Sequence, residues 1–217
     1  MPQGQLDAPS TTVPPDLDAD PSDWDGIPRT AFSMSTAMHQ ADVVPGYTFD
    51  ASVEFAARHD ANNIYFLIQV TDDVLVNDST VLYHDDSIHL YFDVAGDASG
   101  PYSADDHWLV VTSDAVYGSF PIGAVELDLS GSVESGDTGY TVELGIPKQD
   151  LGMSPAQGLL GFNIGLSDDD GMGGPDRDAF GLWYLPAGPR CPSCCEQVTG
   201  AQPWCDTTMF GTLALLP

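Results

Sequence analysis

Residues 62–93 have the sequence NNIYFLIQVTDDVLVNDSTVLYHDDSIHLYFD, which contains two clear strand patterns. The first, residues 64–70, is rich in the β-branched and aromatic side chains that favour strands. The second, residues 87–93, alternates in polarity: Ile88, Leu90 and Phe92 fall on one face, and Ser87, His89 and Tyr91 on the other. Such alternation is typical of an antiparallel sheet with one face in the core and the other in water. We therefore expect a wet face that carries the function.

Similar short patterns recur along the whole chain. Strands are predicted over residues 48–57, 107–112, 115–120, 125–130, 139–147, 161–167, 180–185 and 209–216. The 22 glycines and 17 prolines separate them, and no apolar stripe of helical period persists. About nine to eleven short strands predict an all-β fold, a jelly-roll or immunoglobulin-like β-sandwich of two antiparallel sheets.

The predicted domain organisation is an extended, Pro-rich tail over residues 1–22 followed by a single sandwich domain over residues 23–217. An extended tail can be held at the sheet edge of a neighbouring molecule, which would make it a route to self-association. Beyond the tail, Trp24 stands alone among acidic and turn residues. We expect its ring to plug the bottom of the core.

The charge of the chain is strongly one-sided. Thirty-three acidic residues face five basic ones, for a formal net charge of −28. Nucleic acid is excluded as a partner, because binding it requires Lys and Arg to replace the counterions of the phosphates. An anionic membrane surface is disfavoured for the same reason, and no segment is apolar enough to insert into a bilayer. Two interpretations remain, a solvated acidic surface and bound cations.

Bound calcium would need several oxygen ligands from one region. Three acidic clusters are candidates, and the first two are the stronger: Asp72, Asp73, Asn77 and Asp78; Asp97, Asp105 and Asp106; and Asp168, Asp169 and Asp170. The sequence contains no twelve-residue EF-hand loop. For each cluster the alternative is a plain solvated loop.

All four cysteines lie between residues 190 and 206: Cys191, Cys194, Cys195 and Cys205. A bond between the adjacent Cys194 and Cys195 would be strained. This leaves Cys191–Cys194 with Cys195–Cys205, or Cys191–Cys195 with Cys194–Cys205. A four-thiolate zinc site is the alternative. Disulfides imply an oxidising compartment, so we expect a secreted, extracellular or cell-surface protein.

Several segments, taken in order, resemble the family 9 carbohydrate-binding modules of the DOMON-like sandwiches. They are LDADPSDWDGIP, HDANNIYFLIQVTDDVLVN, YHDDSIHLYFD, YSADDHWLVV, GYTVELGIP, GFNIGLSDDDG and WCDTTMFGTLALL. The resemblance spans nearly the whole chain after the tail. It implies a sandwich with structural calcium, in which a terminal sugar is clamped between two aromatic rings and hydrogen-bonded by polar side chains.

Carried over to this sequence, one clamp ring falls on Tyr83, where sugar-binding members usually have Trp, and the other on Trp204. The position that carries an acid in the family is His89 here, and a polar position of the next strand is Trp108. The resemblance thus implies four ligand-binding residues in an altered sugar site.

The predicted function is non-catalytic binding of a glycan or polysaccharide by a calcium-supported module. The alternative is a structural subunit of a surface layer or filament that keeps the sandwich without sugar binding. Haem ligation by Met and His is a minority hypothesis, since no CxxCH motif is present and nothing fixes the spacing of the ligands. No enzyme is expected, because the nucleophile-elbow, HExxH and phosphate-loop motifs are absent from the sequence.

Overall fold

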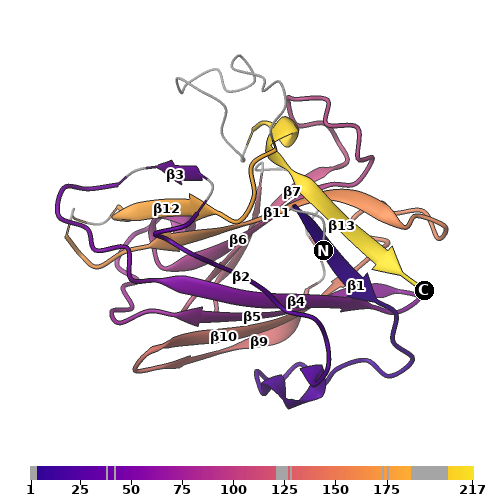
Figure 1. Ribbon diagram of the computed structural model, residues 1–217, viewed down its shortest axis with the longest axis horizontal. Coiled ribbons are helices and arrows are strands. Elements are labelled where there is room, and N and C mark those ends of the chain that lie inside the picture. Colours follow the sequence, from indigo (N-terminus) through magenta and orange to yellow (C-terminus); the bar gives the residue numbers. More distant parts are fainter. Residues whose placement is uncertain are drawn as a thin grey trace.

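The structure is a computed structural model. It describes all residues except 1–3, 38, 42, 121–126, 128, 173, 175 and 187–204. In the part described, thirteen strands form two sheets that face each other as the layers of a sandwich (Figure 1). The predicted β-sandwich is therefore confirmed. No helix in the described part is long and apolar enough to cross a membrane.

Sheet A has eight strands. Along its main path the order is β1 (Gln5–Pro9), β13 (Gly211–Leu216), β11 (Leu159–Asp168), β6 (Ser87–Asp93), β7 (Asp106–Thr112) and β8 (Tyr117–Phe120). Two further strands extend it beside β11, first β12 (Ala179–Leu182) and then β3 (His39–Ala41).

Sheet B has five strands in the order β2 (Thr30–Ser33), β4 (Ser52–His59), β5 (Asn63–Thr71), β10 (Gly139–Pro147) and β9 (Ser130–Gly136). All its neighbouring strands are antiparallel. The predictions for β6 and β10 have the observed bounds. β9 was not predicted, because SGSVESG lacks an apolar alternation. Half of the residues of the strand predicted over 125–130 lie outside the described part.

The main core lies between the sheets. The apolar faces of β6 and β5 meet there, and every one of their core-facing side chains is buried. Aromatic rings fill the middle: Phe66 of β5 stacks on Phe162 of β11 with 5.5 Å between the ring centroids. Such burial of alternating side chains is the main stabilising contribution of a sandwich.

The second face of β6 is not wet, contrary to the prediction. Ser87, His89 and Tyr91 are all fully buried. On this outer face of sheet A a second apolar cluster forms, which we call the outer-face cluster: Tyr91, Trp108, Val110, Phe180, Leu182, Met209 and Phe210. The segments around Tyr102 and Phe210 close over it, and their rings meet edge to face. Alternation of polar and apolar residues indicates that a strand has two different faces, but it does not indicate whether other segments cover the polar face.

The predicted tail is part of the sandwich. Residues Gln5–Pro9 form β1, which pairs in parallel with β13 of the same chain. Leu6 and Ala8 point into the main core and are fully buried. The Pro-rich composition concealed this short alternation, and the sheet edge that β1 occupies is its own.

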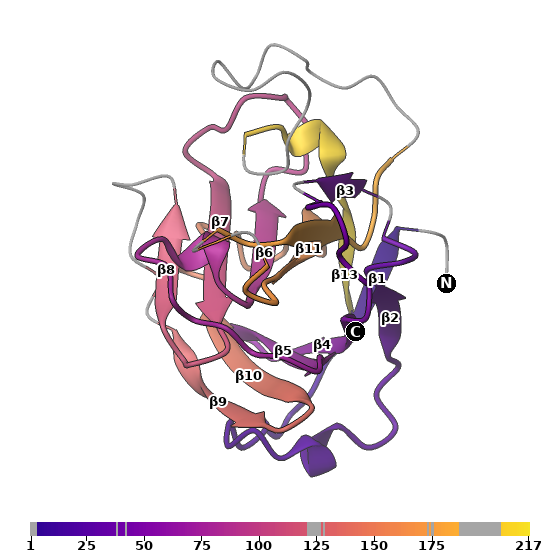
Figure 2. The ribbon, with the colours of Figure 1, turned by 90° about the vertical axis from the view of Figure 1, so that its left-hand side faces the viewer.

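Trp24 is buried, but not in the core between the sheets. It packs with Ala56, Tyr65 and Leu67 in a small cluster on the outer face of sheet B. Its Nε1 donates to Glu143 Oε1 at 2.5 Å, and Arg58 lies 4.8 Å above its ring. The chain before and after Trp24 thus forms a strap under sheet B, seen in indigo below β9 and β10 in Figure 2.

Candidate functional site

Tyr83 sits at the margin of the outer-face cluster. It belongs to a short 3-10 turn, η2 (Leu82–His84), in the loop that joins β5 to β6, and its side chain packs on the cluster. Its ring centroid is 5.4 Å from that of Trp108, which is only 8% exposed. The structure therefore brings together Tyr83 and Trp108, two residues that the sequence proposed as ligand contacts.

His89 supports Trp108 from below and does not face solvent. Trp108 Nε1 donates to His89 Nδ1 at 3.2 Å. An indole nitrogen can only donate, so Nδ1 is the acceptor and the imidazole proton is on Nε2. Nε2 lies 2.9 Å from Ser167 Oγ and donates to it. Burial lowers the pKa of His89 well below its usual value, so the ring is neutral and both nitrogens are engaged within the protein.

Arg177 is a site residue that the sequence prediction missed. One terminal nitrogen of its guanidinium donates to the Tyr83 carbonyl at 2.8 Å and to Ser167 Oγ at 3.3 Å, and the group lies 4.7 Å above the Phe180 ring. Arg177 therefore fixes the backbone that carries the Tyr83 ring. A usable signal was present: it is the single basic residue in the acidic stretch 168–178.

Trp204, the other predicted clamp ring, lies outside the described residues, as do Cys191, Cys194 and Cys195. Cys205 is described and is disulfide-bonded, and none of the described cysteines is free. The pairing of the four cysteines stays a prediction.

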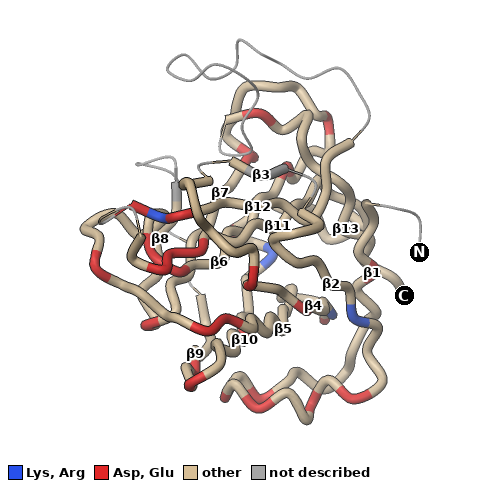
Figure 3. Tube along the Cα trace, turned by 60° about the vertical axis from the view of Figure 1, so that its left-hand side comes forward, with Lys and Arg blue, Asp and Glu red and all other residues tan. Residues whose placement is uncertain are grey.

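Carboxylates gather where strands of both sheets end. β5 ends at Thr71, β11 ends at Asp168, and Ser87 at the start of β6 pairs with Ser167 of β11. This register places the loops that follow β5 and β11 at the same end of the sandwich, where acidic segments lie side by side (Figure 3). Three groups of three aspartates result, and in each group one oxygen per residue lies within 4.8 Å of the others.

The inner trio joins the two sheets. It consists of Asp72, which follows β5 of sheet B, Asp86, which directly precedes β6 of sheet A, and Asp168, the last residue of β11. All three are buried. Burial raises the pKa of Asp86 to about 8, and burial together with the charge of Asp72 raises that of Asp168. Oδ2 of Asp72 and Oδ1 of Asp168 have no hydrogen-bond partner. Buried oxygens without a donor are costly unless something else satisfies them.

Two further trios flank the inner one. The middle trio is Asp78, Asp85 and Asp169, and the outer trio is Asp50, Asp73 and Asp170. Each again contains an unpartnered buried oxygen, Oδ2 of Asp169 and Oδ1 of Asp170. Asn77, predicted as a ligand, donates its amide nitrogen to Ser113 Oγ at 2.7 Å. Carboxylate oxygens converging in this way form the donor set that hard cations such as Ca²⁺ prefer.

The predicted cluster at Asp97, Asp105 and Asp106 has a different character. Asp105 and Asp106 form a trio with Asp93, whereas Asp97 is exposed and belongs to none of the groups found among the described residues. Both oxygens of Asp93 accept backbone N–H groups of residues 96–98. Asp105 and Asp106 likewise accept from backbone amides. Hydrogen bonds thus satisfy this fourth trio, which closes the loop between β6 and β7.

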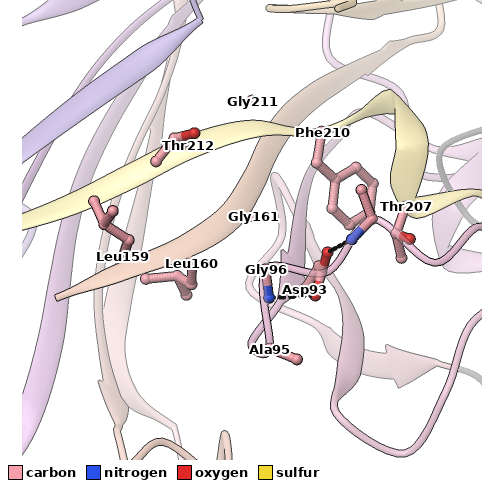
Figure 4. Close-up of a pocket in the computed structure, with 11 residues that line it drawn as sticks. Asp93, Ala95, Gly96, Leu159, Leu160, Gly161, Thr207, Phe210, Gly211 and Thr212 are labelled. Atoms are coloured by element: carbon pink, nitrogen blue, oxygen red, sulfur yellow. Dashed lines mark hydrogen bonds between the residues drawn. The ribbon is translucent and has the colours of Figure 1, made fainter. Parts of the chain in front are cut away.

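A cavity of about 460 Å³ lies next to Asp93, on the outer side of β11 and β13 (Figure 4). Thr207, Phe210 and Thr212 contribute to its wall. The Asp93 carboxylate at this cavity already accepts hydrogen bonds from backbone amides. The cavity therefore presents mainly an aromatic edge and hydroxyls next to the outer-face cluster.

The family profile described as "Carbohydrate family 9 binding domain-like" matches residues 23–216. The chain belongs to this family. The resemblance found in the sequence is thereby confirmed. Family 9 modules are non-catalytic binding domains, and this chain is accordingly not an enzyme.

Solved family 9 structures have the same fold. The chain is similar to a carbohydrate-binding module of family 9 from Caldicellulosiruptor kristjanssonii in complex with glucose, with a TM-score of 0.74 and 19% identity over 97% of this chain and 95% of that one. A family 9 module from the same organism in complex with cellotriose gives a TM-score of 0.74 and 19% identity over 98% of this chain and 93% of that one.

Curated relatives are larger proteins. The chain is 31% identical over 137 residues to endo-1,4-beta-xylanase A of Thermoanaerobacterium saccharolyticum, covering 63% of this chain and 10% of the xylanase. It is 29% identical over 130 residues to exoglucanase XynX of Acetivibrio thermocellus, covering 59% and 10%. The chain therefore spans about a tenth of the length of these relatives.

Proposed function

We propose that the chain is a secreted module that binds a glycan without catalysis, at the margin of the outer-face cluster. The observation that carries this proposal is the Tyr83 ring, which lies at the surface margin of a continuous aromatic layer with Trp108 beside it. Aromatic rings stack on the apolar C–H faces of sugars and hold a flat ligand at low entropic cost. Membership of family 9 and the named glucose and cellotriose complexes of its structural relatives support the same class of ligand.

In this proposal Tyr83 is one stacking platform and Trp204 is the other. Trp108 and His89 act from beneath, because their hydrogen bond and their burial make them a support for the Tyr83 ring. Polar contacts to a sugar would come from the rim of the site. Few buried polar partners and shallow stacking predict modest affinity.

We also propose that the inner, middle and outer trios hold Ca²⁺. The support is the set of unpartnered carboxylate oxygens on Asp72, Asp168, Asp169 and Asp170, which a divalent cation would satisfy. Secretion is proposed on two grounds. Disulfide bonding at Cys205 fits an oxidising compartment, and the relatives include enzymes named for polysaccharides, which are too large to enter cells.

A glycan-array screen in calcium tests the proposal. Tyr83→Ala and Trp204→Ala are expected to lose binding. Tyr117→Ala is the matched control. Tyr117 is also a partly exposed tyrosine (37%), but it lies on β8 and outside the outer-face cluster. Absence of binding to any glycan by the wild-type protein would reject the function. Retained binding by both clamp variants would reject the site.

The alternative function, a structural subunit of a surface layer or filament, relied on an N-terminal tail that binds a neighbouring molecule. β1 pairs within its own chain, which removes the specific support for a tail that binds a neighbour. Light scattering with and without calcium checks this alternative, and a monodisperse monomer in both conditions would end it.

A further inference from the structure

Three consecutive residues, Asp168, Asp169 and Asp170, each belong to a different trio. Their partners are also neighbours in sequence, since Asp85 and Asp86 serve the middle and inner trios, and Asp72 and Asp73 serve the inner and outer trios. The nine aspartates of the three trios therefore form one continuous array. Changing the position of one of its loops would change more than one trio.

The unpartnered oxygens point to an occupant of this array, independently of its acidity. Asp168 and Asp169 are fully buried and Asp72 is 3% exposed, yet each has one oxygen without a hydrogen-bond partner. In the fourth trio, by contrast, backbone amides bind all three carboxylates, and none of the three has a buried oxygen left without a partner. Among the described aspartates, the buried oxygens without a partner belong to four residues of the array and to Asp178, which lies in the loop after β11.

The loop that carries Tyr83 is fastened by the array on both sides. Asp78 precedes the segment 79–84, and Asp85 and Asp86 follow it. Within the segment the structure has only the short turn η2, whose first residue has no side-chain cap. The Ser79 amide donates to Asp85 Oδ1 at 2.8 Å, so even the local closure of the segment involves an array residue.

The loop after β11 meets the same segment. Its Arg177 donates to the Tyr83 carbonyl, and His84 lies 2.6 Å from Asp176. Asp178 closes this loop by accepting the amides of Asp170 and Met172. Tyr83 is thus positioned between two loops, and each of them begins or ends at residues of the array.

From these contacts we propose that binding of Ca²⁺ to the array controls the glycan site, by fixing the loops that hold the Tyr83 ring beside Trp108. This rests on the proposed glycan-binding function of the outer-face cluster. No array carboxylate needs to touch the glycan. In the absence of the cation, the ionised carboxylates of the array repel one another across these short distances, and the repulsion loosens the loops. The platform then loses its fixed position, and the ligand must supply the ordering free energy.

The first test measures the loops directly. Hydrogen exchange of the full chain is followed by mass spectrometry in Ca²⁺, in Mg²⁺ and in EGTA, with far-ultraviolet circular dichroism as a check on the sheets. Peptides covering 72–86 and 168–178 are expected to exchange at least tenfold more slowly in Ca²⁺ than in EGTA, while those of β5 and β10 change little. Equal exchange in Ca²⁺ and EGTA would overturn the proposal.

The second test uses matched variants. Asp85→Asn and the exposed Asp73→Asn are expected to lose the calcium-dependent protection and to weaken glycan binding at least tenfold in Ca²⁺. Asp105→Asn of the fourth trio is expected to behave as wild type. If Asp85→Asn fails to fold, the surface variant Asp73→Asn still gives the result.

The two proposals fail in different ways. Glycan binding of equal strength in Ca²⁺ and EGTA would overturn the calcium control and leave the function intact. No glycan binding under either condition, with calcium-dependent protection of both loops, would reject the function while the coupling of the array to Tyr83 remains. If the two array variants bind calcium with the same stoichiometry as the wild type, the array is not the calcium site and the proposal is overturned.

Discussion

Asp72 and Asp168 lie at the ends of strands in opposite sheets, and their buried carboxyl groups share one trio in which each has an unpartnered oxygen. Ordinary sandwich packing does not explain this contact, because two neighbouring buried carboxyl groups, each with one oxygen that lacks a donor, destabilise the fold that brings them together. An ion that binds both would link sheet A to sheet B. The expected behaviour of the protein with and without calcium follows from this relationship.

Calcium is expected to raise the melting temperature. For one site, a ligand at about 100 times its Kd adds about 2.7 kcal/mol, which for a domain of this size corresponds to about 5–11 °C. Asp168→Asn is expected to reduce the gain sharply, since it removes a ligand of the inner trio. Differential scanning fluorimetry in calcium and in EGTA measures it. Asp97→Asn, a surface change outside the trios, is the control and should keep the full gain.

The stability of the calcium-free protein is expected to fall as pH rises. Burial raises the pKa of Asp86 to about 8 and also raises that of Asp168, whereas in the unfolded chain both carboxyls titrate near 4. The folded state therefore binds more protons than the unfolded state between about pH 4 and pH 8 or above, and stability is lost through this window. Melts in EGTA should give a higher melting temperature at pH 5 than at pH 8. A higher value at pH 8 in EGTA would contradict the assignment.

Enlarging the platform at Tyr83 is expected to strengthen glycan binding. Tyr83→Trp increases the stacking area, and Tyr83→Ala removes it, with a difference of about 1 kcal/mol or more, or at least fivefold in Kd. Isothermal titration calorimetry with a glycan identified in the binding screen measures the affinity of both variants. Tyr83→Phe separates the ring from its hydroxyl and should bind like wild type. Equal affinity of the Ala and Trp variants would show that the ring does not stack on the ligand.

Removing the indole N–H of Trp24 is expected to destabilise the fold without affecting calcium or glycan. Glu143 is fully buried and accepts Trp24 Nε1 as well as the amides of Asp18 and Ala19 at 2.9 and 2.7 Å. Trp24→Phe leaves Oε1 without this donor, for a loss of about 1–3 kcal/mol. Urea unfolding measures the loss. The calcium-induced gain in melting temperature should be the same in Trp24→Phe and in the wild type. A smaller gain in the variant would show that the Trp24 cluster and the calcium site are not independent.

Local patterns in the sequence were sufficient for much of the sandwich. Strands β6 and β10 were predicted with their observed bounds, because both alternate in polarity or end at turn residues and proline. β1 and β9 were not predicted, since Pro-rich or Ser- and Gly-rich sequence hides a short edge strand. Burial of the outer face of β6 could not be predicted, because it depends on loops that return from distant parts of the chain.

The candidate site was predicted only in part, because it too depends on contacts between distant parts of the chain. Aspartates 72, 73, 78 and 168–170 were recognised as candidate ligands, but as separate clusters. The pairing of Ser87 with Ser167, 80 positions apart in sequence, decides which aspartates meet, and it brings in Asp85 and Asp86. Arg177 escaped notice because its role is to hold a backbone carbonyl, for which the sequence offers only the signal of a single basic residue in an acidic stretch.

The succession of Asp168, Asp169 and Asp170 has a consequence for how this chain can vary. Loops between strands usually tolerate the gain or loss of a residue. Here a single deletion or insertion would shift three carboxylates at once, each away from a different pair of partners. Substitutions in the array can be compensated one trio at a time, but a change of length cannot. Related chains that keep the array should therefore keep the length of this segment while the nearby loops differ in length.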